Sequence, residues 1–514
     1  MNPTSFFAHH GIVENPFGAE EARHDPVFQR LVFRPECAHP EFDKVIGTLD
    51  HPHAAIVFGE KGAGKTALRL LIGKRIAQHN QEKPKRRVLL VPYDDMNPVL
   101  DLVARHRGGP GADALMKGFR LPDHQDAMLG LAVTKLFDSL LGGASGDEEG
   151  AALPPDARDR LKRLSRERRV EAAVLAALYD RPRGGNVVGR WNEIRKRLRL
   201  GWRLPFSASR VGATLATVVA LGLFLAPLGA KWFKALDNLP KWTFPMAGVA
   251  AATAGLLWIL WLWRHTRLWN LVRRIRAEAP AIDRTAPQLR AMLRMMRPRD
   301  RANQPWPQPG GDGTNARYEL TQKLVELLRA FDHAGTIVLI DRVDEPTLVA
   351  GKPERMRALV WPLFESKFLQ QDGVGIKMLL PIELRYLVHR EGAEFFQEAR
   401  LDKQSVVDRL AWSGSTLYDL CTARIRACHK DRESRIALTD LFAEDVKREA
   451  LVDALGQMAQ PRDAFKLLYS VIREHCQRVG EDDAEFRVPR FILDSVRKEQ
   501  AQRVSELQRG LSPG

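Results

Sequence analysis

Residues 59–66 read GEKGAGKT, a spacing of glycines and lysine that can bind the phosphates of a nucleotide. The GxxxxGK[ST] pattern follows the apolar run 54–58 and precedes a segment with helical periodicity, which is the context that a phosphate-binding loop requires. The glycines allow consecutive backbone N–H groups to point at the β-phosphate, and the positive end of the following helix adds to this attraction. We therefore predict a nucleotide-binding loop made of Gly59, Glu60, Lys61, Gly62, Ala63, Gly64, Lys65 and Thr66.

Lys65 and Thr66 have separate expected roles in this loop. The Lys65 ammonium would contact the β- and γ-phosphates, and the Thr66 hydroxyl would ligate Mg²⁺. The expected ligands are therefore ATP and Mg²⁺. The chain contains no NKxD-like guanine motif, which disfavours GTP only weakly, so the base stays open.

A second segment, TIVLIDRVDE at 336–345, supplies an apolar strand that ends in carboxylates. We expect Asp341 to hold Mg²⁺ through water at the end of this strand. Asp344 or Glu345 could polarise the attacking water, and we slightly prefer Glu345. The alternative is an ordinary strand that runs into an acidic turn.

Arg462 is a third candidate, in the segment GQMAQPRDAFKLL at 456–468. Pro461 suits the first position of a helix, which would put Arg462 in its first turn. An arginine there could contact the γ-phosphate and respond to its loss by movement of the helical unit. In a chain with 79 Lys and Arg, a surface arginine is an equal alternative. Pro381 and Glu383 end the fourth predicted strand, and neither is assigned a sensing role.

The elements that must position these residues alternate apolar strands with helices, which is typical of a mostly parallel α/β sheet. The predicted strands are 54–58, 87–93, 336–340, 376–381 and 405–412. The predicted helices are 65–78, 354–369, 385–396 and 416–429. No strand is predicted after Asp431. The expected fold is an α/β P-loop NTPase with helices on both faces of the sheet, a transmembrane helical hairpin inserted into it, and a C-terminal helical lid.

Composition divides the chain further. Residues between two Gly/Pro-rich connectors hold 30 Lys and Arg against 10 Asp and Glu, whereas the rest of the chain holds 49 and 53. A basic excess confined to one segment indicates a partner of that segment. The predicted parts are a lead-in at 1–53, the first half of the core at 54–141, a linker at 142–155, the basic insert at 156–301, a linker at 302–315, the second half of the core at 316–430 and a helical subdomain at 431–514.

Two uncharged apolar stretches, 211–230 and 242–263, lie in the basic insert, and each has the length that spans a bilayer. They predict a transmembrane hairpin, with two buried core helices as the alternative. The flanks 190–210 and 264–284 hold seven and six Lys or Arg, and the connecting loop 231–241 holds three. We therefore expect an inner or plasma membrane protein with both ends of the chain in the cytoplasm. The basic flanks would bind anionic lipid, and nucleic acid is a less favoured partner.

The remaining features are less informative. Four cysteines in 514 residues form no disulfide framework, and the first residues lack the pattern of a signal peptide. Cys421, Cys428 and His429 lack metal-ligand spacing, so we expect buried thiols and no metal other than Mg²⁺. Residues 15–17 could form a wall against which the base stacks, or could simply cover the edge of the sheet.

The loop at 59–66, the acidic strand at 336–345 and the hairpin between them resemble the KAP family of P-loop NTPases, which is related to STAND and AAA-type ATPases. AQPRDAFKLL at 459–468 is similar to the proline–arginine lid motif of that group. The resemblance implies a membrane-tethered ATPase that serves regulation, complex assembly or, in bacterial members, exclusion of phage. KAP members commonly have two adjacent aspartates and a final arginine in the acidic strand, whereas DRVDE here is closer to STAND and NACHT proteins, so the subfamily stays open.

Three functions are compatible with these features. We prefer a cytoplasmic ATPase that is anchored by its own hairpin and acts as a nucleotide-controlled switch, with protein partners or by self-assembly. The second is a soluble AAA-type ATPase that works with nucleic acid through the basic insert. The third is a scaffold that binds nucleotide without turnover, although the intact acidic residues argue mildly against it.

Overall fold

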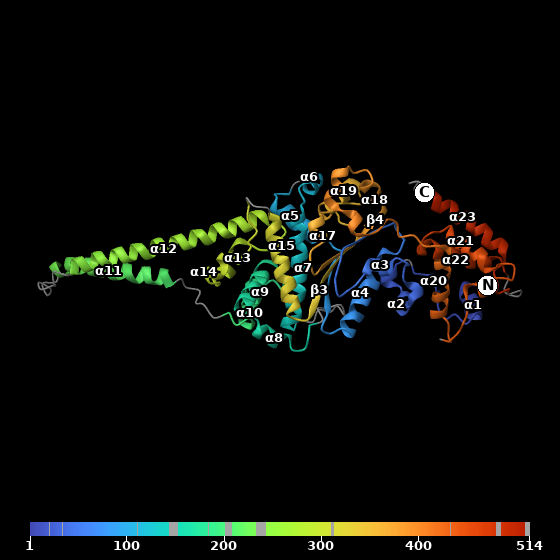
Figure 1. Cartoon of the computed structure of the whole chain (residues 1–514), viewed down its shortest axis with the longest axis horizontal. Helices are drawn as coiled ribbons and strands as arrows, with labels where there is room; N and C mark the ends of the chain where they lie inside the picture. Colours follow the sequence, from blue (N-terminus) through green and yellow to red (C-terminus); the bar gives the residue numbers. More distant parts are fainter. Residues whose placement is uncertain are drawn as a thin grey trace.

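The computed structural model is elongated (Figure 1). A sheet with helices on both faces forms the middle, a long helical hairpin projects from one end, and a helical unit with both the first and the last helix of the chain forms the other. The structure describes residues 1–19, 21–32, 34–109, 111–142, 153–182, 184–200, 208–232, 243–309, 313–431, 433–479 and 485–508.

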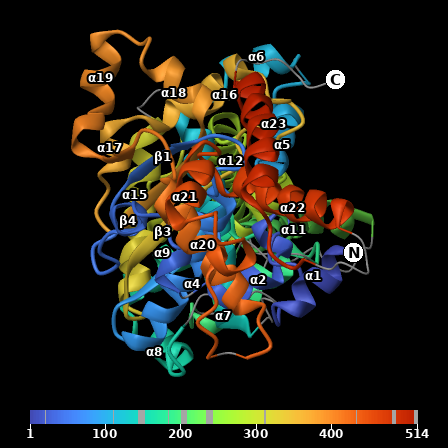
Figure 2. The ribbon, with the colours of Figure 1, turned by 90° about the vertical axis from the view of Figure 1, so that its right-hand side faces the viewer.

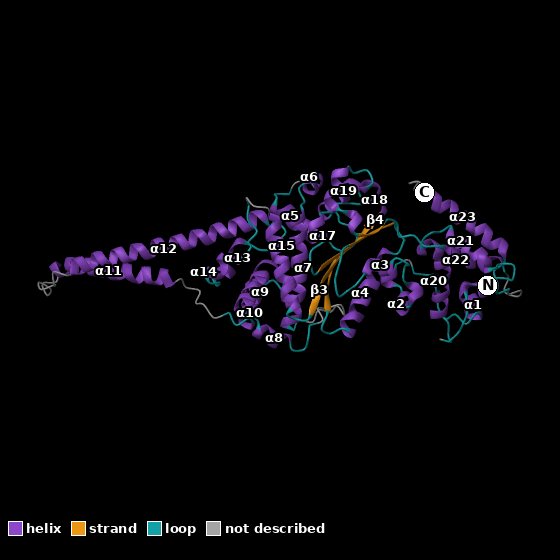
Figure 3. Ribbon diagram, in the orientation of Figure 1, coloured by secondary structure: helices purple, strands orange, loops and turns teal. Residues whose placement is uncertain are grey.

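The sheet has five parallel strands in the order β2-β3-β4-β1-β5 (Figure 3). Its strands are mostly apolar, as expected for a parallel sheet covered on both faces. The strands are β1 (Ala55–Gly59), β2 (Arg87–Tyr93), β3 (His333–Ile340), β4 (Val374–Pro381) and β5 (Ser405–Val407). The prediction of a mostly parallel α/β sheet is thus confirmed. Because β4 separates β1 from β3 and all three run the same way, the loops after them meet at one edge.

The fifth predicted strand, 405–412, is wrong over most of its length. Only its first three residues form β5, and the chain bends at Asp408. The Leu410 backbone N–H then donates to the Phe58 carbonyl at 2.8 Å. The indole Nε1 of Trp412 donates to the Ala63 carbonyl at 3.0 Å. The apolar residues that suggested a longer strand instead cover the loop after β1.

Helices cover both faces of the sheet because successive strand residues point to opposite sides. On one face, Ile56 belongs to a core with residues of α7 (Leu121–Leu141) and α15 (Gly313–Arg329). On the other face, Val57 packs in a cluster with residues of α4 (Lys65–Glu82). The first predicted helix, 65–78, is therefore confirmed and is one turn longer.

Two predicted helices are interrupted. The segment 354–369 forms α16 (Pro353–Val360), a 3₁₀ turn at Trp361–Leu363 and the short α17 (Ser366–Leu369). The proline in that turn lacks the N–H that a continuing α-helix needs. The segment 385–396 forms α18 (Ile382–Val388) and α19 (Ala393–Ala399), with a glycine before the second helix.

The C-terminal part is helical, as predicted. In the described residues after Asp431 we find no strand, only an isolated bridge between Phe442 and Val488. An apolar cluster separate from that of the sheet joins the helices of this unit (Figure 2). These helices are α20 (Gly414–Ala427), which confirms the fourth predicted helix, α21 (Arg448–Gly456), α22 (Pro461–Arg478) and α23 (Arg490–Gln508).

The N-terminal lead-in, predicted as one part at 1–53, is divided between two places. Its first helix, α1 (Pro3–His9), packs with the C-terminal unit, in which Phe6 and Phe17 are buried. The ring of Phe17 lies 6.1 Å from that of Phe465 on α22. By contrast, α3 (Phe42–Ile46) packs on the sheet. Residues 15–17 therefore belong to the helical unit and do not cover the sheet edge.

Most of the basic insert belongs to the core of the sheet and is not a separate domain. The helices α8 (Ala157–Arg163), α9 (Arg166–Tyr179), α10 (Val187–Arg197) and α13 (Ala286–Arg294) contribute to the same apolar cluster as the strands. In the second predicted linker Trp306 is buried in that cluster. Residues 143–152 and 310–312 of the two predicted linkers lie outside the described residues.

The projecting hairpin consists of α11 (Ala208–Trp232) and α12 (Thr243–Glu278) (Figure 1). Of the described residues, one helix, Pro245–Glu278, is long and apolar enough to cross a membrane, and 11% of its apolar window is buried. This low burial is unlike that of a core helix. The described side chains of α11 form only a shorter apolar helix, Arg210–Leu225, so the second span stays a prediction. The connection at 233–242 lies outside the described residues.

Candidate functional site

The predicted phosphate-binding loop connects β1 to α4 at the carboxyl edge of the sheet. Gly62 and Gly64 have φ angles of 101° and 100°, in the left-handed region that glycine adopts without strain. Gly59 serves a different purpose, because a Cβ there would lie 3.3 Å from both Leu410 Cβ and Lys65 Cγ. Two glycines therefore shape the turn and the third allows close packing.

The Lys65 side chain, at the start of α4, folds back over the loop. Its Nζ donates to the backbone carbonyls of Gly59 at 2.7 Å and Glu60 at 3.1 Å. Burial lowers the pKa of Lys65, and the negative charge of three carboxylates at the same edge opposes this shift: Asp341, Asp344 and Glu383. The structure thus brings the predicted lysine together with carboxylates from the loops after β3 and β4.

Asp341 follows β3 directly and is 2% exposed. Its Oδ1 accepts from the Arg342 backbone N–H at 2.9 Å, whereas Oδ2 is buried without a hydrogen-bond partner in the described part of the chain. Arg69 Nε lies 3.7 Å from Oδ2. Burial raises the pKa of Asp341, and the charge of Arg69 opposes the rise. A buried carboxylate oxygen with unused capacity suits a cation or a water bound to one.

Thr66 and Asp341 are the two side chains that would hold Mg²⁺. Thr66 is the second residue of α4 and is half-buried. Among the described residues no group of three His, Cys, Asp or Glu side chains is arranged to hold a metal. A nucleotide-bound Mg²⁺ needs no such group, because phosphate oxygens and waters complete its coordination. The unpartnered Asp341 Oδ2 therefore fits this kind of site.

Asp344 and Glu345 lie differently. Arg342 has a positive φ of 59°, which is unusual for a residue with a side chain and turns the chain sharply after Asp341. The Glu345 side chain is 59% exposed, and its Oε2 lies 3.4 Å from Arg342 Nη1. Asp344 instead acts on the pKa of Lys65. The charge of Asp344 thus influences the loop lysine, whereas the Glu345 carboxylate pairs with Arg342, and the choice of Asp344 or Glu345 as the water-activating residue stays a prediction.

Arg462 approaches the loop from the C-terminal unit. As predicted, α22 begins at Pro461. A Cβ on Gly62 would lie 3.3 Å from Arg462 Cβ and 3.4 Å from its Cδ. The Nε of Arg462 is buried and has no hydrogen-bond partner in the residues that the structure covers. A buried guanidinium N–H beside a phosphate-binding loop is available to an anion, which argues against an ordinary surface arginine.

The other residues of the loop differ in exposure and in their contacts with the rest of the chain. Lys61 is exposed and Ala63 is buried. The Glu60 carboxylate accepts from Arg409 Nη2 at 2.6 Å and, through its other oxygen, from the Gln460 amide. Gln460 directly precedes α22, so Glu60 ties the loop to the C-terminal unit. The loop pattern leaves this position unspecified, so the sequence carried no signal for the contact.

Sequence reasoning also missed Arg69 and Asp94. Arg69 forms an ion pair with Asp94, in the loop after β2, and reaches toward Asp341. Arg69 lies four residues after Lys65, hence on the same face of α4. That spacing was a usable signal. Glu383, in the first turn of α18, was noted in the sequence without a role, and it proves to lie within electrostatic range of Lys65.

Comparison with protein-family models finds no match, and comparisons with curated proteins and with solved structures find none either. What the structure itself defines is an α/β protein with a five-stranded parallel sheet, helices on both faces and a helical hairpin that projects from its core. The resemblance to KAP NTPases therefore rests on the motifs at 59–66, 336–345 and 459–468 and on the inserted hairpin.

Proposed function

We propose that this protein is a membrane-anchored ATPase of the P-loop class, similar to KAP NTPases, in which hydrolysis controls the position of the C-terminal helical unit. The observation that carries the proposal is the convergence of Lys65, Asp341, Asp344 and Arg462 on one loop. These residues come from three distant parts of the sequence. A basic side chain, a buried carboxylate with an oxygen that accepts no hydrogen bond within the described chain, and an arginine whose buried Nε has no acceptor there are the kinds of group that phosphoryl transfer uses.

In the proposed reaction the backbone N–H groups of the loop and the N-terminus of α4 bind the phosphates. Lys65 exchanges its carbonyl partners for phosphate oxygens and offsets their charge. Asp344 orients a water and accepts its proton as the water attacks the γ-phosphorus. The bond between that phosphorus and the bridging oxygen breaks, which releases ADP and phosphate. Mg²⁺ held by Thr66 and Asp341 would neutralise charge on the β- and γ-phosphates.

Arg462 connects this chemistry to movement. Its unpartnered Nε can donate to an oxygen of the γ-phosphate, where negative charge is concentrated. After hydrolysis that partner leaves, and the helical unit loses one of its contacts with the loop. The Glu60 contacts with Gln460 and Arg409 involve no phosphate, so this proposal does not require them to change. The proposed switch is therefore a change in how tightly α22 is held to the loop.

Membrane anchoring is supported by the side chains of the hairpin. Leu215 and Ile259 are 61% and 65% exposed, and similar exposure recurs along both helices. Exposed apolar surface of this extent is costly in water and is removed by lipid. The same surface makes a soluble nucleic-acid ATPase the less well supported alternative.

The test uses the full chain in lipid nanodiscs and compares Lys65→Ala with Lys61→Ala. Both changes remove one positive charge from the loop, but only Lys65 lies over it. We expect Lys65→Ala to weaken ATP binding by at least about tenfold, and Lys61→Ala to leave it nearly unchanged. Unaltered ATP affinity in Lys65→Ala would refute the nucleotide site. Tight ATP binding without phosphate release by the unaltered chain would support the scaffold alternative instead.

A further inference from the structure

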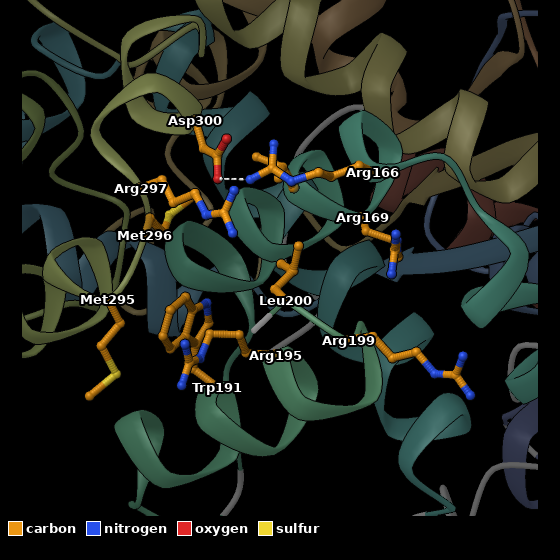
Figure 4. Close-up of a pocket in the computed structure, with 11 residues that line it drawn as sticks. Arg166, Arg169, Trp191, Arg195, Arg199, Leu200, Met295, Met296, Arg297 and Asp300 are labelled. Atoms are coloured by element: carbon orange, nitrogen blue, oxygen red, sulfur yellow. Dashed lines mark hydrogen bonds and ion pairs between the residues drawn. The ribbon is translucent and has the colours of Figure 1, made fainter. Parts of the chain in front are cut away.

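We propose that an arginine-lined cavity near the base of the hairpin binds a phosphorylated anion at a site separate from the nucleotide loop. The cavity has a volume of about 390 Å³ and lies between α9, α10 and the segment that follows α13. Five guanidinium groups and one carboxylate line it (Figure 4): Arg166, Arg169, Arg195, Arg199, Arg297 and Asp300.

The positive charges that line the cavity outnumber the negative ones. Among the described residues that line it, Asp300 is the one acidic residue, and its carboxylate pairs with Arg166 at 2.8 Å. Figure 4 shows Arg297 beside this pair. Five positive charges against one negative charge leave an excess of four around the cavity, where Arg166, Arg199 and Arg297 lie at its exposed rim. Such a cavity attracts anions more strongly than the same arginines would on an open surface.

One of the arginines is buried, and a second has a buried Nε. The Arg195 side chain is 4% exposed and lies over the ring of Trp191, with its Cζ 5.7 Å from the ring centre. Burial lowers the pKa of Arg195, because the charged form loses its solvation. Arg169 donates to the Leu198 carbonyl at 3.3 Å through Nη1, but its Nε is buried with no hydrogen-bond partner in the described chain. Within the described chain the Arg169 Nε–H has no acceptor, and a bound anion would provide one.

The lining also indicates the chemical class of the anion. Guanidinium groups present paired N–H donors that match the oxygens of a phosphate. The wall between them is apolar, formed by residues such as Val170, Leu200 and Met296. A phosphate on a small organic group fits both surfaces, and the volume is that of a small-ligand pocket. Because α9 and α10 lie at the end from which the hairpin projects, a phospholipid headgroup is one source (Figure 1). A soluble phosphorylated compound is the other.

The experiment measures pyrophosphate binding by titration calorimetry, with the full chain in phosphatidylcholine nanodiscs. The chain carries Lys65→Ala, so that the nucleotide loop does not contribute. Arg169→Gln and Arg297→Gln are compared with Arg299→Gln, an exposed arginine next to Asp300 that does not line the cavity. We expect each lining variant to weaken binding by about tenfold, while Arg299→Gln changes it little.

Asp300→Asn is the control for misfolding, because this variant is expected to strengthen pyrophosphate binding and not to weaken it. It removes the only carboxylate found on the described lining of the cavity and frees Arg166, so affinity for pyrophosphate should rise severalfold. Equal affinities of the lining variants and Arg299→Gln, or no gain in Asp300→Asn, would overturn the proposal.

A last comparison identifies the source of the anion. Loss of pyrophosphate binding in nanodiscs that contain phosphatidylglycerol supports the site and assigns it to a headgroup, whereas persistent binding supports it and assigns it to a soluble ligand. Displacement of pyrophosphate by duplex DNA at matched phosphate concentration would instead make the cavity part of a nucleic-acid surface and overturn the assignment.

Discussion

Gly62 and Arg462 are in close contact, although 400 positions separate them in the chain. A Cβ on Gly62 would come within 3.3 Å of Arg462 Cβ and 2.9 Å of the Gln460 side-chain oxygen. The backbone of the phosphate loop and the start of α22 therefore meet without an intervening side chain. Any shift of the loop on nucleotide binding must also displace α22, because groups packed this closely cannot move independently.

Arg462→Ala should lower ATP turnover by roughly ten- to a thousandfold, because it removes a donor to the charge that develops on the phosphate. ATP affinity should change less. The control is Arg473→Ala, an exposed arginine on the same helix. Phosphate release at saturating ATP is the measurement, and equal rates in the two variants would mean that Arg462 has only a packing role.

Asp344→Asn should reduce turnover strongly, whereas Glu345→Gln should have a small effect. Asp344 acts on the pKa of Lys65, and the Glu345 side chain is 59% exposed beside Arg342. Each change removes one negative charge, and the two residues are adjacent in the chain, so each serves as the control for the other. The single-turnover rate of ATP cleavage separates them. A larger defect in Glu345→Gln would return the role of water activation to that residue.

The sequence predicted those parts of the fold whose signals are local. Largely apolar runs predicted four strands and their parallel character, and the glycine pattern of 59–66 marked the turn between β1 and α4. The fifth strand failed because Leu410 and Trp412 are apolar for another reason, which is contact with the loop after β1. The sequence alone does not reveal which surface a given apolar side chain will pack against.

Contacts between segments that are distant in the sequence could not be predicted either. The pairing of Glu60 with Gln460 and Arg409 depends on how the C-terminal unit docks, and no local pattern encodes it. The basic insert looked like a domain because of its charge and its connectors. Its helices nevertheless bury apolar faces in the core of the sheet. The amino-acid composition of a segment reflects mainly its exposed side chains. It does not show what the buried face of the segment packs against.

Lys377→Met should stabilise the fold at neutral pH and flatten its dependence on pH. Lys377 lies in β4, is fully buried, and its Nζ lacks a hydrogen-bond partner in the described chain. Burial lowers the pKa of Lys377 from 10.5 to about 7. The unfolded state therefore binds a proton between about pH 7 and pH 10.5 that the folded state does not. Stability should fall as the pH decreases through this window, by at most roughly 5 kcal/mol.

Denaturant midpoints at about pH 7 and about pH 10 measure this effect in the unaltered chain and in Lys377→Met. The difference between the two proteins should be largest near pH 7 and nearly vanish at high pH. Lys367→Met, at an exposed lysine on α17, is the control. A midpoint of Lys377→Met that is lower at both values would show that the lysine makes a favourable contact.

Removal of residues 211–263 should release the protein from membranes. The remaining part of α12 keeps Leu268, Val272 and Ile275, which pack in the core of the sheet, so the body should stay folded. Recovery in the soluble fraction after an alkaline carbonate wash is the measurement, and far-ultraviolet circular dichroism checks the fold. Full retention of the shortened chain on membranes would show that another segment provides the anchor.

Arg317→Met should destabilise the protein by about 3–5 kcal/mol, because it leaves the buried Asp126 carboxylate without its ion-pair partner. Both side chains are fully buried, with Arg317 Nη2 2.8 Å from Asp126 Oδ2. Adding Asp126→Asn removes the uncompensated charge and keeps an acceptor for the Tyr179 hydroxyl, so part of the loss should be recovered. Thermal unfolding of the single and double variants tests this. No recovery in the double variant would mean that Arg317 acts mainly through packing.

The length and continuity of α12 determine how the body of the protein can move relative to the membrane in the proposed arrangement. It runs for 36 residues, about 54 Å, from the apolar stretch into the body, where Arg317 donates to the carbonyl of Glu278 at its last position. A body fixed to an unbroken rod cannot pivot at a joint, so whatever tilts the rod tilts the body. In the proposed membrane arrangement, bilayer thickness would set the angle at which the far end, with α22 and the phosphate loop, is presented to the cytoplasm. The thickness of the lipid would then act as an input to the same switch that ATP controls.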